Sequence, residues 1–223
     1  MWTLAENRFT KVGRDYIEAL SGLTKSNKED KRALFNTLTQ LRLSEKYSLG
    51  LHLPVSIGHG DTSWFYIYPK GKNPYIGFNE IDSKFTTIFH MRDDYDFGHL
   101  NVTPSAMGAW QAYLYSIAPT ILPTAWHGGY IRRTYFFSLE AVGKIPLYLC
   151  KEFEQITERD LIPLVQYKKR KAKVVCCYWS EWAGLVRETI SIRYDANKNK
   201  ILSLDREKKD VLVPYDCQIC FCF

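Results

Sequence analysis

Histidine and aspartate side chains gather in one short stretch of this chain. Two imidazoles and three carboxylates fall within ten residues: His90, Asp93, Asp94, Asp96 and His99. Nitrogen and oxygen ligands of this kind suit Mg²⁺, Mn²⁺ or Zn²⁺, and neighbouring aspartates repel one another unless a cation compensates their charge. The alternative is a polar loop, because aspartate often bonds its own backbone there. We expect no obligatory cofactor, and we place a divalent metal, if one binds, in this segment.

Two further histidines lie among glycines, where a ligand can approach the backbone closely. They are His59, with Asp61 two residues later, and His127, which follows Trp126 and precedes Gly128. Imidazole is the natural acid or base near neutral pH, so His127, His59 and Asp61 are the candidate catalytic residues of a metal-assisted hydrolase or a transferase. The Trp126-His127-Gly128 triplet is similar to the first motif of ADP-ribosyltransferases, in which a His-Gly pair holds the nicotinamide cofactor. That resemblance covers three residues, and we do not carry the activity over.

A pair of carboxylates beside an arginine forms a third candidate. Glu181 and Glu188 flank Gly184 and Arg187, and two nearby carboxylates can divide acid and base work when their environments differ. The chain contains no G-x-S-x-G, P-loop, G-x-G-x-x-G or H-E-x-x-H motif, so the enzyme classes that those motifs mark have no support.

One run of positively charged residues differs in composition from the rest of the chain. Five cations occupy the six positions from 168 to 173: Lys168, Lys169, Arg170, Lys171 and Lys173. Such a run can neutralise phosphates and give binding a steep salt dependence; the alternative is a solvated loop that opens the next strand. Arg132 and Arg133 extend this basic surface only if the fold brings them close. Trp179 and Trp182 could stack on bases, although aromatic residues at strand spacing are more often core.

The cysteines favour a reducing compartment. Cys176 and Cys177 are adjacent, and no turn residue separates Cys217 from Cys220, so a straight strand would place these two sulfurs on opposite faces. Zinc requires ligands that converge on one point. The alternative interpretation is a zinc site formed by Cys217 and Cys220 together with the upstream Cys176 and Cys177. We expect buried free thiols and a cytoplasmic protein.

Composition narrows the function without identifying it. The chain has 223 residues, a formal net charge of +6 and 15% aromatic residues. No signal pattern or apolar run of membrane-spanning length occurs, so we expect no membrane partner. The leading hypothesis is a non-catalytic cytosolic binding protein that engages a macromolecule through a basic and aromatic surface. We expect a protein partner or a second copy of this chain, with nucleic acid as the alternative; the competing hypothesis is the enzyme described above.

Hydrophobic periodicity predicts the elements that position these residues. Apolar residues at helical spacing indicate an N-terminal helix pair, with one helix over 5–21 and a second after Ser26 that buries Leu34, Phe35, Leu38 and Leu41. Thr103 and Pro104 predict the start of a central helix over 104–118. The predicted strands before position 140 span 47–53, 64–68, 75–78, 85–91 and 132–137.

The last fifty residues predict a β-meander. Strands are expected over 174–179, 190–194 and 201–204, followed by a charged turn over 205–210 and a final strand from Val211 to the end. The fold class is therefore α+β, with an N-terminal helix pair, a mostly antiparallel sheet, one central helix and a C-terminal β-meander. We expect a single domain over 1–223, with a subdivision near 167 as the alternative.

Overall fold

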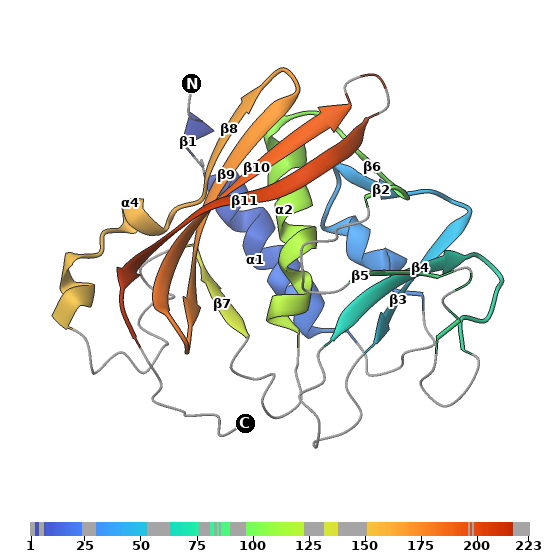
Figure 1. Ribbon diagram of the computed structural model, residues 1–223, viewed down its shortest axis with the longest axis horizontal. Helices are drawn as coiled ribbons and strands as arrows, with labels where there is room; N and C mark the ends of the chain where they lie inside the picture. Colours follow the sequence, from blue (N-terminus) through green and yellow to red (C-terminus); the bar gives the residue numbers. More distant parts are fainter. Residues whose placement is uncertain are drawn as a thin grey trace.

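The protein has the predicted α+β fold (Figure 1). The computed structural model describes residues 3–4, 7–23, 30–52, 63–75, 81–82, 84, 86–89, 97–122, 132–137, 151–195, 197 and 199–215. In chain order the elements are β1 (Thr3–Leu4), α1 (Asn7–Ser21), the 3₁₀ helix η1 (Arg32–Asn36), β2 (Leu41–Leu43), β3 (Tyr47–His52), β4 (Trp64–Pro69), β5 (Thr87–Phe89), β6 (Leu100–Val102), α2 (Ala106–Ile121), β7 (Arg133–Phe136), the 3₁₀ helix η3 (Lys151–Gln155), α4 (Glu158–Leu161), β8 (Leu164–Lys168), β9 (Lys171–Ser180), β10 (Gly184–Asp195) and β11 (Lys200–Val213).

The main sheet is antiparallel and contains the C-terminal meander. Its strand order is β1-β8-β9-β10-β11, and β7 also pairs with β9. β8 pairs with residues 171–175 of β9, and β7 pairs with residues 177–180 along the same edge. β7 and β8 therefore share one edge of β9, on either side of Cys176. We call the face that packs against α2 the inner face, and the face that carries Phe136, Cys177 and Trp179 the outer face.

One part of the predicted meander is wrong. The charged run over 205–210 does not form a turn but lies within β11, where Lys209 is directly opposite Glu188 and Asp210 is opposite Arg187. Within the described sheet β11 pairs only with β10, and an edge strand accepts charged side chains because one of its sides faces solvent. A run of charges resembles a turn in sequence, yet here it continues the ladder.

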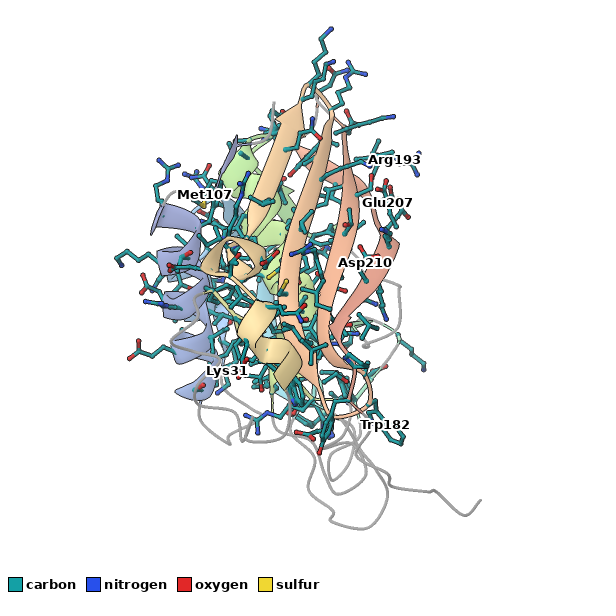
Figure 2. The ribbon with its side chains drawn as sticks, turned by 90° about the vertical axis from the view of Figure 1, so that its left-hand side faces the viewer. Lys31, Met107, Trp182, Arg193, Glu207 and Asp210 are labelled. Carbon is teal, nitrogen blue, oxygen red and sulfur yellow. The ribbon has the colours of Figure 1, made fainter. Side chains whose placement is uncertain are left out.

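The central helix α2 is buried on every side. All its residues from Met107 to Ile121 are buried, as expected for a helix that is apolar around its whole circumference. It begins two residues later than predicted, because the Ser105 hydroxyl accepts a hydrogen bond from the Gly108 amide at 2.9 Å and caps the helix. Figure 2 shows α1 and α2 on one side of the long strands.

Helix α1 packs on α2 with the predicted apolar stripe. Phe9, Tyr16 and Leu20 are buried, and the Trp110 indole donates a hydrogen bond to the Phe9 carbonyl oxygen at 2.9 Å. The second N-terminal helix is the short 3₁₀ helix η1 rather than a helix that reaches Leu41.

A tertiary hydrogen bond explains why the second helix stops early. The backbone amide of Gln40 donates to Oε1 of Gln111 at 2.6 Å, and its carbonyl oxygen accepts from the Thr103 amide at 2.9 Å. These bonds hold the chain extended, so Leu41 enters β2 opposite Val102. Periodicity alone cannot reveal a bond to a helix that lies about seventy residues further along the chain.

The smaller sheet, β3-β4-β5, lies on the other side of α2 (Figure 1). Phe65 of β4 and Phe35 of η1 both stack on Tyr115 of α2. The alternation of apolar and polar residues in β3 is typical of a strand with one solvent-facing side, yet residues 48–52 are all buried. Gly50 explains part of this, since the Tyr66 ring lies directly over it and leaves no room for a β carbon.

Candidate functional sites

Most of the predicted catalytic and metal-binding residues lie outside the described residues. They are His59, Asp61, His90, Asp93, Asp94, Asp96 and His127. His99 is described, lies half-buried before β6, and places its ring 4.2 Å from that of Tyr47. Within the described ranges, no three His, Cys, Asp or Glu side chains come together in a way that could hold a metal ion. The enzymatic and metal-site hypotheses therefore stay predictions.

The predicted basic run forms a tight hairpin between β8 and β9. Lys168 ends β8 directly opposite Lys171, the first residue of β9, and only Lys169 and Arg170 connect them. Lys169 has a φ of 54°, in the left-handed region that tight strand connections often require. Lys168 to Lys171 are all exposed, which both interpretations of the run require.

The hairpin continues into a row of cations across the sheet. Lys168 is opposite Lys171, and Lys171 is opposite Arg193 of β10, so three neighbouring strands present positive side chains on the outer face. Like charges directly opposite in a sheet destabilise it by roughly 0.2–1 kcal/mol per pair. We call Lys168, Lys169, Arg170, Lys171 and Arg193 the basic tip.

Acidic residues of β11 compensate Arg193, one member of the tip, and the neighbouring Lys173, but not the rest of the tip. Lys173 pairs with Glu207 at 2.8 Å, and Arg193 lies 3.9 Å from Asp205. Within the described part of the chain, no ion pair involves any of the four residues from 168 to 171. The positive potential is therefore concentrated at the tip.

The other residues considered for this surface lie elsewhere. Arg133 is opposite Ser180, at the far end of β9, about 30 Å from the tip at strand rise. Trp179 is buried, and Trp182 is exposed in the turn after β9. Figure 2 shows Trp182 and Arg193 near opposite ends of the sheet. A single basic and aromatic surface built from these residues is therefore not formed.

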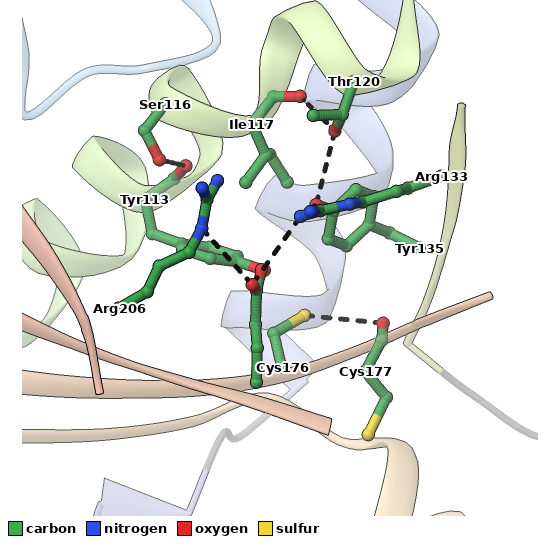
Figure 3. A network of polar contacts seen from close by, with 10 residues as sticks. Tyr113, Ser116, Ile117, Thr120, Arg133, Tyr135, Cys176, Cys177 and Arg206 are labelled. Atoms are coloured by element: carbon green, nitrogen blue, oxygen red, sulfur yellow. Dashed lines mark hydrogen bonds and ion pairs between the residues drawn. The ribbon is translucent and has the colours of Figure 1, made fainter. Parts of the chain in front are cut away.

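A buried polar cluster on the inner face is the feature that sequence reasoning missed. Glu188 of β10 is completely buried, and its Oε1 accepts a hydrogen bond from the Tyr113 hydroxyl of α2 at 2.8 Å. Its Oε2 lies 3.6 Å from a guanidinium nitrogen of both Arg133 and Arg206. Figure 3 shows these two arginines approaching from opposite sides, with Tyr113 between them.

Aromatic side chains complete this cluster. The Arg133 guanidinium lies 4.2 Å from the centre of the Tyr178 ring, a favourable cation–π distance, and its Nη1 donates to the Tyr135 hydroxyl at 3.4 Å. Burial, with a smaller contribution from the charge of Glu188, raises the pKa of both Tyr113 and Tyr135 well above the usual tyrosine range. Both phenols therefore remain neutral and act as hydrogen-bonding groups.

The pairing of Glu181 and Glu188 as an acid and a base is wrong. Glu181 lies in the turn after β9, where it accepts a hydrogen bond from the Trp179 indole at 3.3 Å, while Glu188 lies in the middle of β10. Arg187 points to the outer face and binds Asp160 at 2.7 Å. One signal could have shown that Glu188 is buried, because it is in phase with Ile190, which is also buried.

The two described cysteines are buried free thiols, as predicted. Cys176 faces the inner cluster, and burial is the main cause that raises its pKa well above the usual range. Cys177 faces outward, donates to the Asp160 carbonyl oxygen at 3.1 Å, and has a pKa raised to about 11, chiefly by burial. Thiols with raised pKa values are poor nucleophiles. Cys217 and Cys220 lie outside the described residues.

Comparison with protein family models, with curated proteins and with solved structures finds no match to this chain. In the part of the chain that the structure describes, no helix has the length and apolar character needed to cross a membrane.

Proposed function

We propose that this chain is a cytoplasmic, non-catalytic binding protein that engages nucleic acid through the basic tip. The observation that carries the proposal is the row of Lys168, Lys171 and Arg193, which are directly opposite one another on three adjacent strands. This arrangement costs folding stability, and a polyanion that binds the row removes that cost. The buried free thiols Cys176 and Cys177 support a reducing compartment.

The geometry of the tip favours a phosphate backbone over an acidic protein surface. Adjacent strands are about 4.8 Å apart, so the row spans roughly 10 Å, and two more cations extend from the turn beyond it. Several closely spaced cations can each neutralise one phosphate and release its counterion. Backbone contacts of this kind position a nucleic acid without reading its sequence, so we expect sequence-independent binding.

The test is binding of fluorescent single-stranded DNA, single-stranded RNA and duplex DNA, measured by anisotropy over a series of salt concentrations. In the variant K168Q/K169Q/K171Q the affinity should fall for all sequences alike. The slope of log affinity against log salt should decrease by about 0.7–0.9 for each phosphate that the variant no longer neutralises.

A matched control separates position from net charge. Lys46, Lys70 and Lys72 are exposed and lie together where β3 begins and β4 ends, so K46Q/K70Q/K72Q removes the same charge elsewhere. This control should bind nucleic acid like the unmodified protein. If none of the three nucleic acids binds at low salt, or if both triple variants lose affinity equally, the proposal is wrong. Binding of an acidic protein with no binding of nucleic acid would identify the other class of partner.

A further inference from the structure

We infer that the nucleic acid bound at the basic tip is a duplex, and that Asp205 and Glu207 beside the tip disfavour a single strand. The inference rests on the proposed function and names the class of ligand that this same site takes. Three properties of the tip support a duplex. Its positive charge is concentrated over a short distance, carboxylates limit it on one side, and the described residues around it present no aromatic ring on the outer face.

The tip carries its charge over a short distance. Lys168, Lys171 and Arg193 are opposite one another on three adjacent strands, so this row spans roughly 10 Å. Lys169 and Arg170 lie in the turn beyond the row. Over about 10 Å of its axis a duplex carries about six phosphate charges, whereas one of its strands carries about three. The five cations of the tip therefore match the charge density of a duplex more closely than that of a single strand.

Carboxylates limit the positive row on the side of β11. Asp205 lies 3.9 Å from Arg193. Glu207 lies 2.8 Å from Lys173, which belongs to the next row of the outer face, and Figure 2 shows Glu207 and Arg193 near the same end of the strands. Proteins that bind single strands follow the backbone along a positive groove for several nucleotides. A single strand that continued from the tip across the outer face would meet both carboxylates, so the tip favours a ligand that brings many phosphates to one short surface.

The aromatic side chains nearest to the tip belong to the core. Tyr167 and Tyr194 pack edge to face, with ring centroids 6.0 Å apart, and both lie against the hydrophobic core on the inner face. On the outer face, the described residues of the two rows nearest the turn are Lys, Arg, Gln, Ser and Asp, without an aromatic residue. Stacking of bases on aromatic rings supplies much of the affinity of proteins that bind single strands. A duplex keeps its bases stacked inside and binds through its backbone charge, which is the interaction that this surface offers.

Counterion release strengthens the preference for a duplex. Each phosphate contact contributes about 0.9 to the slope of log affinity against log salt for B-form DNA and about 0.7 for a single strand. If each of the four cations from 168 to 171 neutralises one phosphate, the two slopes are about 3.6 and about 2.8. Between about 1 M and about 50 mM salt, this difference increases the preference for the duplex about tenfold.

The experiment is fluorescence anisotropy with a short labelled DNA duplex, an RNA duplex of the same length, and the single strands of each, whose sequences are not self-complementary. At about 50 mM salt the unmodified protein should bind a duplex at least about tenfold more tightly than the corresponding single strands, with a steeper salt slope. If the single strands bind as tightly as the duplexes, the inference is wrong while the proposed function stands. If no probe binds, the proposed function itself is wrong.

The variant D205N/E207Q tests the limit that the carboxylates set. It removes two negative charges beside the row, so single strands should gain more affinity than duplexes and the preference for a duplex should decrease severalfold. The control is E154Q/E158Q, which removes the same charge from exposed glutamates of η3 and α4, away from the tip (Figure 1), and should keep the preference of the unmodified protein. Circular dichroism and the melting temperature show whether each variant is folded. If the two variants have the same preference, the role assigned to Asp205 and Glu207 is wrong.

Discussion

Replacing Glu188 by Gln should reveal how much the buried cluster contributes to folding. Gln preserves the shape of the side chain and can still accept the hydrogen bond from Tyr113, but it removes the counterion of Arg133 and Arg206. Breaking a buried ion pair typically costs about 3–5 kcal/mol, and we expect about 3 kcal/mol because both arginines are slightly exposed. That is a large share of the roughly 5–15 kcal/mol that stabilises a typical domain.

A double-mutant cycle isolates the hydrogen bond from the ion pairs. Y113F removes the 2.8 Å bond to a charged acceptor, which should cost about 1.5–3 kcal/mol in the free energy of unfolding. In the E188Q background the acceptor is neutral, so the same change should cost only about 1 kcal/mol. The difference of about 1 kcal/mol is the coupling between the two residues.

The assay is urea unfolding followed by tryptophan fluorescence, which is informative because Trp110 stacks on Tyr113. E181Q serves as the control, since Glu181 lies in a surface turn and should change stability by less than about 0.5 kcal/mol. An E188Q protein within about 0.5 kcal/mol of the unmodified protein, or a cycle without coupling, would refute the ionic description of the cluster.

Three further predictions concern packing, reactivity and pH. G50A should destabilise the protein by about 1–3 kcal/mol in urea unfolding, because its β carbon would lie 2.0 Å from the Tyr66 ring. The control is G71A, whose β carbon meets no atom within 4 Å; it should cost only the roughly 1 kcal/mol that a left-handed backbone conformation imposes. Cys177, with a pKa of about 11, should react with iodoacetamide at pH 8 far more slowly in the folded protein than in urea, as peptide mass spectrometry will show; equal rates would contradict its burial. The pKa of Asp160 is lowered in the folded protein, so the stability that its carboxylate contributes is present above the unfolded pKa of about 4 and is lost as the pH falls further. The difference in free energy of unfolding between the unmodified protein and D160N should therefore shrink below about pH 4. A difference that grows there would contradict the lowered pKa.

The sequence predicts those helices and strands that are determined by residues close together in the chain. α1 follows from the stripe of Phe9, Tyr16 and Leu20, which are all buried, and the alternation through Ile190 and Ile192 predicts β10. Prediction fails where a distant partner decides the structure. Gln111 holds the chain before β2 extended, and the pairing of Lys209 with β10 turns an apparent loop into a strand.

The same distinction explains which site could be found. The basic tip is a consecutive run, so composition alone locates it. The buried cluster combines Tyr113, Arg133, Glu188 and Arg206 from four separate elements, and no pair of them is near in sequence. Only Glu188 gives a signal in the sequence. A carboxylate in phase with Ile190 must either be buried with a partner or be exposed by an irregularity in the strand.

The alternation of β10 keeps the buried cluster and the basic tip independent. Glu188 and Arg193 are five residues apart, about 17 Å along the strand, and their side chains point to opposite faces. Substitutions this far apart with no shared partner usually act additively. Substitutions in the buried cluster should therefore leave nucleic-acid binding at the basic tip unchanged, and substitutions in the tip should leave the stability that the cluster contributes unchanged. E188Q and K168Q/K169Q/K171Q consequently test two separate features of the molecule.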